Sequence, residues 1–326
     1  MPEFDLIRLV ERHCRGQADT DVGLTLGIGD DCALIEPPVG QHLAVSTDTL
    51  NEGIHFFPGT DAEALGHKSL AVSLSDLAAM GAVPRWAFLN LSLPRETPDW
   101  VDAFARGLAA LADAHGVVLA GGDTCSGPLS VTTTVIGPVP PGRALTRAGA
   151  RVGDLVVVSG VLGDAALARQ RLADGEAPGP KLRRALERPE PRVTLGTALR
   201  GVATACIDLS DGLAADLHRL ADRSGCGAEV ELERLPASEA FRALDPAQRW
   251  ALQTGGGDDY ELCFTVPAAR RDRLGEVQRA CAVPLTVVGR MTGGSGLRWL
   301  DAAGRERPVP AGGYEHFASG AGSRTP

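Results

Sequence analysis

The stretch Ala203-Thr-Ala-Cys-Ile-Asp-Leu-Ser-Asp-Gly-Leu-Ala-Ala-Asp-Leu-His-Arg-Leu220 sets our expectation for the second half of the chain. Its first five residues, Ala203–Ile207, are mostly apolar and predict a short buried strand. Leucines at 213, 217 and 220 then repeat at helical spacing and predict an amphipathic helix. Asp208 and Asp211 therefore lie in a strand-to-helix turn, where Gly212 permits tight backbone geometry.

Two interpretations of this turn remain open from the residues alone. The N–H groups at a helix N-terminus suit phosphate oxygens, and aspartates can hold the metal ions that bridge such oxygens. Alternatively, Ser210 or Asp211 only caps the helix that follows. The other acidic segments of the chain decide between them.

Four further aspartate segments stand beside glycine or small hydroxyl residues. Two are expected directly after strands at Leu43–Val45 and Val117–Ala120, and one on a helix. Taken alone, Asp30-Asp31 favours a solvated hairpin turn and Asp76 a surface group. The segments are Gly29-Asp30-Asp31, Ser46-Thr47-Asp48-Thr49, Ser75-Asp76 and Gly121-Gly122-Asp123.

These acidic turns predict a metal–nucleotide enzyme if they meet at one site. Two carboxylates about 4 Å apart repel by roughly 4 kcal/mol at an effective dielectric of about 20. Bound cations offset that repulsion, and oxygen ligands favour Mg²⁺ with a phosphate-bearing substrate. Paired glycines before Asp123 would allow close backbone approach to a phosphate.

Bulk properties predict a soluble, cytoplasmic protein of two domains. The chain has 326 residues, 44% of them hydrophobic, and a net charge of −9, which argues against a nucleic-acid partner. Its seven cysteines form no C-x-x-C pair, which predicts reduced, mostly buried thiols and no zinc site. Residues 1–14 read as an amphipathic helix, and no apolar run is long enough for a membrane span.

The pattern of apolar residues predicts an α/β (α+β) protein. Gly137–Gly142 and the residues up to Gly153 read as a break and linker, so we place the domain boundary near residue 145 and expect a disordered tail at 318–326. Strands are expected at 33–35, 43–45, 86–93, 117–120, 129–136, 155–158, 203–207, 228–232, 261–266 and 285–289. Helices are expected at 62–80, 98–115, from 164, and at 192–200, 213–223 and 268–281.

Missing motifs narrow the enzyme class. The chain lacks the P-loop pattern G-x-x-x-x-G-K-[ST] and the catalytic motifs of protein kinases. Phosphate charge must then be met by metal and arginine, and Arg143 and Arg147 beside the expected domain junction are the arginines we favour. A surface-exposed linker is the simpler interpretation of both.

The motifs together resemble the thiamine-monophosphate kinase family, in order from about residue 3 to 317. The matching segments are Ile28–Asp31, Thr47-Asp48 followed by Glu52-Gly-Ile-His55-Phe56, Ser75–Ala82, Gly121–Thr124, Arg143–Arg147, Asp208–Gly212, Gly256-Gly-Asp-Asp-Tyr260-Glu-Leu262 and Gly313–Phe317. The resemblance implies the two-domain fold of aminoimidazole ribonucleotide synthetase. In that fold an N-terminal mixed-sheet domain (here 1–145) binds metal and nucleotide and forms the core of a homodimer. A C-terminal α/β domain (here 146–317) follows it.

The resemblance further implies ATP-dependent phosphorylation of thiamine monophosphate to thiamine diphosphate, with several Mg²⁺ ions. One departure is Asp258, where the family usually has glutamate, and another is Ala165–Arg169, where glycine is more usual. By motif, the metal shell comprises Asp30, Ser46, Thr47, Asp48, Asp76, Asp123, Asp208 and Asp211, of which Asp48, Asp76, Asp208 and Asp211 are taken as catalytic. Nucleotide contacts come from Gly122, Asp123, Arg147 and Ser210, and substrate contacts from His55, Asp258 and Tyr314.

Other functions are weighed against this one. Acceptor and donor are both phosphates, so we expect direct in-line transfer without a general base or a phosphoenzyme.

The alternatives are a purine-pathway cyclo-ligase or hydrogenase-maturation enzyme of the same superfamily, or a divalent-cation-binding dimer without activity. Phe56, Trp86 and Tyr314 are the aromatic residues considered for stacking on thiamine, although Trp86 in a strand favours a core position.

Overall fold

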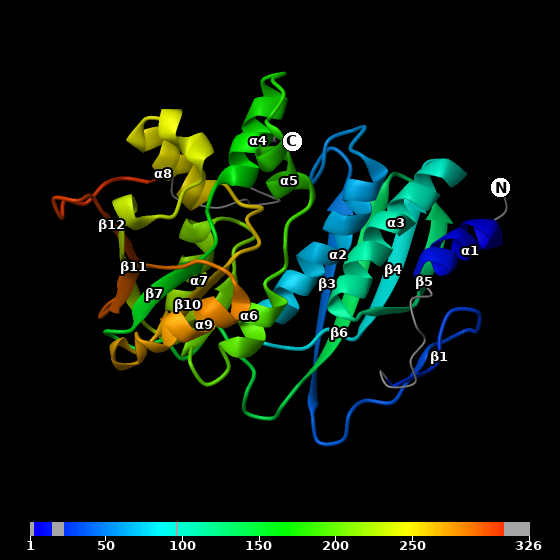
Figure 1. Cartoon of the computed structure of the whole chain (residues 1–326), viewed down its shortest axis with the longest axis horizontal. Helices are drawn as coiled ribbons and strands as arrows, with labels where there is room; N and C mark the ends of the chain where they lie inside the picture. Colours follow the sequence, from blue (N-terminus) through cyan, green and yellow to red (C-terminus); the bar gives the residue numbers. More distant parts are fainter. Residues whose placement is uncertain (1–2, 15–22, 96, 310–326) are drawn as a thin grey trace. The chain divides into compact units, whose positions relative to one another are not determined.

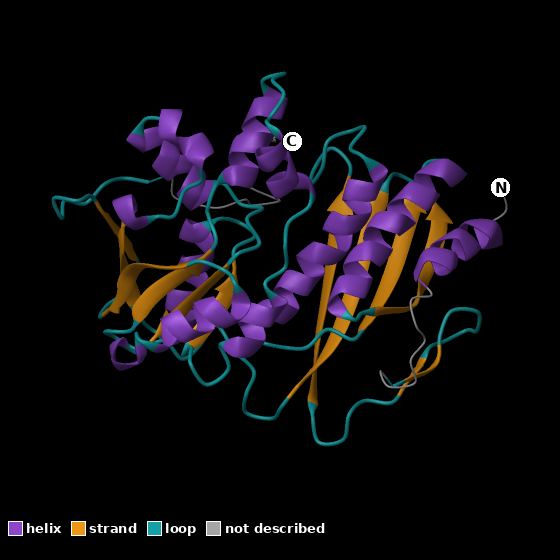
Figure 2. Cartoon of the chain, in the orientation of Figure 1, coloured by secondary structure: helices purple, strands orange, loops and turns teal. Residues whose placement is uncertain are grey.

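A computed structural model describes residues 3–14, 23–95 and 97–309 (Figures 1 and 2). The described chain forms two compact units, each built on one main sheet. The first unit runs to Gly142 and the second begins at Arg143, except that the short segment Ala78–Gly81 belongs with the second. The predicted tail at 318–326 lies outside the described residues.

Unit 1 contains a mixed four-stranded sheet in the order β3-β6-β4-β5. Strand β6 pairs with both β3 and β4 in antiparallel orientation, whereas β4 and β5 are parallel. The mixed sheet predicted for the N-terminal domain is therefore confirmed. The strand bounds are β3 His42–Asn51, β4 Trp86–Leu93, β5 Val118–Ser126 and β6 Ser130–Val139, with a separate antiparallel pair β1 Leu24–Leu26 and β2 Leu34–Ile35.

Helices α2 (Ala62–Ala79) and α3 (Pro98–His115) lie side by side over one face of this sheet (Figure 1). The predicted apolar stripes are confirmed, since Leu70, Leu74 and Phe104 are fully buried. Helix α1 (Glu3–Cys14) packs against α3. Trp86 is also fully buried, which confirms its core position.

Two glycines allow α2 and α3 to approach closely. A Cβ on Gly107 of α3 would lie 1.8 Å from the Glu63 carbonyl oxygen of α2. A Cβ on Gly66 of α2 would lie 2.0 Å from the Phe104 carbonyl oxygen. Neither position tolerates a side chain without moving a helix backbone, so these residues set the spacing of the helix layer.

Unit 2 contains a six-stranded sheet in the order β12-β9-β11-β7-β10-β8, antiparallel except for the pair β12 and β9 (Figure 2). The apolar face of α7, predicted from Leu213, Leu217 and Leu220, is buried with Ile207 and Val156 of the sheet. The strands are β7 Leu155–Ser159, β8 Ala205–Asp208, β9 Gly227–Glu231, β10 Leu262–Val266, β11 Leu285–Thr292 and β12 Leu297–Leu300. The helices are α4 Asp164–Ala173, α5 Pro180–Glu187, α6 Val193–Ala198, α7 Leu213–Ser224, α8 Pro246–Gly255 and α9 Arg273–Cys281, with 3₁₀ turns at Leu232–Arg234, Glu239–Ala243 and Ala268–Arg270.

Several predicted element boundaries were wrong. The strand expected to end at Val45 continues to Asn51, and the one expected to end at Ala120 continues to Ser126. β6 likewise continues through Gly137 to Val139, where a break was predicted. Polar or glycine-rich segments can remain in a strand when neighbouring strands supply the hydrogen bonds, which local patterns do not report. The sequence prediction also omitted β1, α5, α8 and β12.

All seven cysteines lie in the described part of the chain and are free thiols. Cys14, Cys206, Cys226 and Cys263 are buried, as predicted for most of them, whereas Cys32 and Cys125 are exposed. Burial raises the pKa of Cys14 to about 12, with a smaller contribution from Asp113. That thiol therefore remains protonated at neutral pH.

Candidate functional site

Ser46, Asp48 and Asp76 meet between β3 and α2 in unit 1. Alternate residues of β3 point to the same face, so Ser46 and Asp48 both face α2. The Ser46 hydroxyl donates a hydrogen bond to Asp76 Oδ2, and Asp48 contacts Ser73 one turn before Asp76. Asp76 is thus a partner of β3 and not the lone surface carboxylate that its position in a helix suggested.

The Asp48 carboxylate carries an unbalanced negative charge. Burial, followed by the nearby charge of Asp76, raises its pKa from 3.8 to about 6, and the contact with Ser73 works in the opposite direction. Asp48 Oδ2 is buried without a hydrogen-bond partner. An ionised carboxylate whose oxygen is buried without a partner destabilises the fold unless a cation balances its charge. The two carboxylates and one hydroxyl here are oxygen donors that fit a hard divalent cation such as Mg²⁺.

Thr47 and Asp123 lie away from this group of side chains. The Thr47 hydroxyl pairs with that of Thr134 at 2.9 Å on the opposite, exposed face of the sheet. Asp123 lies in β5, at the other edge of the sheet from β3, and pairs with Asn90. Strand spacing alone puts about 14 Å between the two edges. The structure therefore does not bring Asp123 next to Asp48 within one chain.

Gly122 has a packing role that the sequence did not reveal. Its φ is +146°, and a Cβ would lie 1.8 Å from the Leu89 carbonyl oxygen of β4. The glycine therefore admits the neighbouring strand, whereas we had expected a turn open to phosphate. A nucleotide contact through Gly122 stays a prediction.

The remaining predicted residues of unit 1 are dispersed. Asp30 and Asp31 are exposed in the connection between β1 and β2, as the hairpin interpretation expected. His55 Nδ1 accepts a hydrogen bond of 3.0 Å from the Asn51 amide, and Phe56 is buried. Tyr314 lies outside the described residues.

The turn Asp208–Gly212 of unit 2 connects β8 to α7 as predicted. Asp208 ends the strand and is buried. The N-cap of α7 is Gly212, and no side chain caps the helix, so the capping interpretation of Ser210 and Asp211 was wrong. Asp211 is instead available for another role.

Arg219 of α7 joins two aspartates. Its Nη1 donates at 2.6 Å to both Asp211 Oδ2 and Asp216 Oδ1. Asp216 Oδ2 also accepts the Asp211 backbone N–H at 3.0 Å. Burial, and then the charge of Asp211, raises the pKa of Asp216 to about 6, although Arg219 opposes both effects. The pair Asp216–Arg219 therefore holds Asp211 in place at the start of the helix.

The segment Gly256–Glu261 is hydrogen-bonded to this turn. The Asp258 amide donates to the Ser210 carbonyl at 2.8 Å, and the Tyr260 amide donates to the Leu209 carbonyl at 2.9 Å. The Tyr260 hydroxyl donates to Asp258 Oδ1 at 3.0 Å. The structure therefore brings together two predicted groups, the turn with its two aspartates and Asp258.

The predicted arginines show no special environment. Arg143 and Arg147 are both exposed, in agreement with the simpler interpretation of a surface linker. The Arg147 carbonyl accepts a hydrogen bond from the Ser224 hydroxyl at 3.0 Å, which fixes the backbone at Arg147. A nucleotide contact through Arg147 stays a prediction.

Sequence reasoning missed several residues of these groups. Asp216 was detectable, because it interrupts the apolar stripe of α7 and a buried acid there needs a partner. Ser73 was detectable in the same way, as a hydroxyl one turn from Asp76 on a buried helix. The pairing of Arg192 with Glu261 gave no signal, because 69 residues separate them.

Two features are absent from the described residues. No group of three or more His, Cys, Asp or Glu residues in this part of the chain is arranged to hold a metal ion. No helix among the same residues is long and apolar enough to cross a membrane. The prediction that all five acidic segments share one site stays a prediction.

Models of two domains match the chain: the N-terminal domain of AIR synthase related protein at residues 29–139 and its C-terminal domain at 151–300. These matches define the class as an AIR synthase-related protein with two α/β domains. Structures of the hydrogenase maturation protein HypE from Escherichia coli, at 22% identity and a TM-score of 0.75, share this fold.

More similar relatives define the family. The thiamine-monophosphate kinase of Escherichia coli is 45% identical over 328 residues, covering 97% of this chain and 98% of its own. The crystal structure of the Stenotrophomonas maltophilia thiamine-monophosphate kinase has a TM-score of 0.84 at 45% identity, covering 92% of this chain and 96% of that one. The structure of AaThiL complexed with AMPPCP and TMP has a TM-score of 0.74 at 31% identity and covers 97% of both chains. The chain belongs to the thiamine-monophosphate kinase family.

Proposed function

We propose that the protein transfers the γ-phosphoryl group of ATP to the phosphate of thiamine monophosphate, giving thiamine diphosphate and ADP. The observation that carries this proposal is 45% identity to a thiamine-monophosphate kinase over nearly the whole of both chains. The relative solved with AMPPCP and TMP supports the same pair of substrates at 31% identity.

Asp48, Asp76 and Ser46 would hold Mg²⁺ in unit 1, and Asp208 and Asp211 in unit 2. The orphaned Asp48 oxygen and the oxygen-only donors support this assignment. Bound there, Mg²⁺ would neutralise charge on the phosphate oxygens. The family motifs add Asp30, Thr47 and Asp123 to the proposed ligand set, although Thr47 and Asp123 lie away from Asp48 within one chain. The proposed nucleotide contacts come from Gly122, Asp123, Arg147 and Ser210.

The substrate would be contacted by His55, Asp258 and Tyr314. An acceptor phosphate is already a nucleophile at neutral pH, so no residue needs to remove a proton from it. The work of the chain is then to position two anionic groups and to offset their repulsion. We infer direct in-line transfer, and a phosphorylated protein trapped in the absence of acceptor would contradict it.

The proposed domains are 1–145 for metal and nucleotide binding and for dimerisation, and 146–317 for the C-terminal α/β domain. A homodimer is supported by the outer face of β3, where Leu43 is 41% exposed and Val45 is 60% exposed. Apolar side chains in a row on a sheet face are typical of an interface.

The direct test is to incubate the purified protein with thiamine monophosphate, ATP and Mg²⁺ and to measure thiamine diphosphate by chromatography. We expect turnover that EDTA abolishes and added Mg²⁺ restores. Absence of thiamine diphosphate with folded protein and excess Mg²⁺ would refute the proposal.

A further inference from the structure

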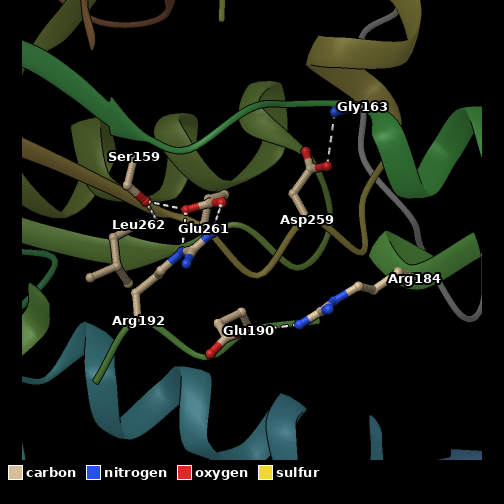
Figure 3. A network of polar contacts seen from close by, with 8 residues as sticks. All are labelled: Ser159, Gly163, Arg184, Glu190, Arg192, Asp259, Glu261 and Leu262. Carbon is tan, nitrogen blue, oxygen red and sulfur yellow. Dashed lines mark hydrogen bonds and ion pairs between the residues drawn. The ribbon is translucent and has the colours of Figure 1, made fainter. Parts of the chain in front are cut away.

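The segment Gly256–Glu261 between α8 and β10 presents its acidic side chains to two different environments. Glu261 is buried, and Asp259 Oδ2 is out of reach of solvent. Asp258 retains 20% side-chain exposure and is bonded by the neighbouring Tyr260 hydroxyl. Asp259 and Glu261, drawn in Figure 3, therefore hold the segment in place, whereas Asp258 is the acidic residue that can meet a ligand.

The first fastening is a bidentate ion pair. Arg192 donates from Nε to Glu261 Oε2 at 2.8 Å and from Nη2 to Oε1 at 2.5 Å. The Ser159 hydroxyl donates to the same carboxylate and accepts the Leu262 amide at 2.9 Å. Figure 3 shows Arg192 and Ser159 converging on the Glu261 carboxylate. The fork geometry fixes the direction of the glutamate as well as its charge.

The second fastening lies two residues earlier. Asp259 Oδ1 accepts the Gly163 amide at 2.8 Å, at the residue that precedes α4. Gly163 leaves no room for a side chain, since a Cβ there would lie 2.8 Å from Phe241 Cζ. The carboxylate of Asp259 is thus tied to the backbone at the start of α4 (Figure 3).

The backbone is strained at two residues next to these contacts. Asp258 has φ 62° and Tyr260 has φ 49°, in the left-handed region that side chains other than glycine rarely adopt. Such conformations persist only where surrounding contacts over-determine them. The amides of both residues donate to the Asp208–Gly212 turn, so the strain is held directly beside the proposed metal ligands.

We propose that Arg192, Glu261 and Asp259 are positioning residues that impose this backbone and thereby aim the Asp258 carboxylate at thiamine monophosphate. The proposal rests on the proposed function for the identity of the substrate. Loss of these residues should weaken the binding of thiamine monophosphate and not that of ATP, because the segment that they hold in place carries Asp258.

The test uses Glu261→Gln, Arg192→Lys and the double variant Arg192→Met/Glu261→Gln in the full-length enzyme. The double variant guards against misfolding, since each charge alone would be left buried without its partner. We expect KM for thiamine monophosphate to rise about tenfold or more, because misplacing the Asp258 carboxylate would remove one charge-assisted hydrogen bond to the substrate. KM for ATP should change less than about threefold.

Amide hydrogen exchange gives a readout independent of turnover. The amides of Asp258 and Tyr260 should exchange about tenfold faster in Glu261→Gln than in wild type, because their fixed conformation is released. The matched control is Glu229→Gln, which removes an acid on β9 that pairs with Arg290 of β11 and Arg298 of β12 but leaves the segment untouched. It should alter neither KM nor these exchange rates.

A purely structural role predicts a lower Tm with KM for thiamine monophosphate unchanged, and that result would overturn the proposal. So would an equal rise in both KM values, or unchanged exchange in the variants. If the wild-type enzyme makes no thiamine diphosphate, the proposed function fails, and unchanged exchange at Asp258 and Tyr260 still overturns the positioning role.

Discussion

Two aspartates, the half-buried Asp48 and the buried Asp216, show how one residue can depend on partners remote in the sequence. Asp48 lacks a partner for one oxygen and lies beside a second acid, whereas Asp216 has Arg219 within 2.6 Å. Both carboxyls have their pKa raised to about 6, with burial as the first cause. Both carboxyls are therefore mostly ionised at neutral pH, but Arg219 balances the charge of Asp216 whereas Asp48 Oδ2 has no hydrogen-bond partner. Asp48 is thus the residue at which pH and metal binding should be linked.

Replacement of Asp48 by Asn should remove a pH dependence of stability. The pKa of Asp48 is about 6 in the fold and near 3.8 in the unfolded chain, so the folded state binds the proton more tightly. Its contribution is therefore fully present below pH 3.8 and is lost as pH rises through 6, by about 2–3 kcal/mol. Urea unfolding in EDTA between pH 4 and about 8 should show this loss in wild type and not in Asp48→Asn.

Magnesium provides the second half of this test. At neutral pH, Mg²⁺ should raise the free energy of unfolding of wild type but not of Asp48→Asn. Asp174→Asn, at an exposed aspartate after α4, is the control and should behave as wild type. Equal magnesium stabilisation of both proteins would contradict the assignment of Asp48 as a ligand.

Asp211→Asn should lower kcat about a hundredfold or more, because it removes a proposed metal ligand from the reaction site. The fold should survive, since Arg219 keeps its ion pair with Asp216. Thermal unfolding and steady-state kinetics measure the two effects separately. Asp222→Asn, exposed on the same helix, should leave both unchanged. An Asp211→Asn enzyme of normal activity would refute the role.

At the scale of elements, close packing of α2 on α3 governs unit 1. Gly→Ala in a helix usually stabilises it by about 0.5–1 kcal/mol. Gly107 is an exception, because its Cβ would lie 1.8 Å from a carbonyl oxygen of the other helix. The same backbone contact explains why a glycine is needed in a helix that is otherwise rich in alanine and leucine.

Gly107→Ala should therefore destabilise the protein by about 1–3 kcal/mol, the usual cost of overpacking. Gly275→Ala in α9 is the matched control, since its nearest neighbour would be the flexible end of Arg279 at 3.6 Å. It should stabilise slightly. Urea midpoints with unchanged m values would measure both, and a stable Gly107→Ala protein would show that α2 and α3 can separate at little cost.

At the scale of the whole molecule, the proposed residues are divided between two units. Ser46, Asp48 and Asp76 belong to unit 1, whereas Asp208, Asp211 and Asp258 belong to unit 2. Each group is organised by its own sheet. Assembly with a second chain is a separate property, and the exposed apolar residues of β3 give a way to test it.

Val45→Glu should convert a dimer to a monomer, because it places a charge on the exposed apolar face of β3. Light scattering after size-exclusion chromatography would measure the mass. Val152→Glu is the control, since Val152 is 66% exposed in unit 2 and its replacement should leave a dimer. A Val45→Glu dimer would exclude this face as the interface.

The sequence by itself determined the elements whose signals are local. Helix α3 follows from Pro98, a repeating apolar stripe and Gly116, which has the left-handed φ of 63° at the helix end. Strand β4 was predicted with its observed bounds, and the Asp208–Gly212 turn was predicted between the right strand and helix. Periodicity and turn chemistry act over a few residues, so the sequence carries them directly.

Only the tertiary structure decided which side chains meet. It put Thr47 and Asp48 on opposite faces of β3, because the strand continues through a polar stretch that pairs with β6. It also joined Arg192 to Glu261 and Asp258 to Ser210, across long separations in the chain. The physical reason is that such partners are chosen by strand order and register, and these depend on the packing of whole layers and not on the residues next in sequence.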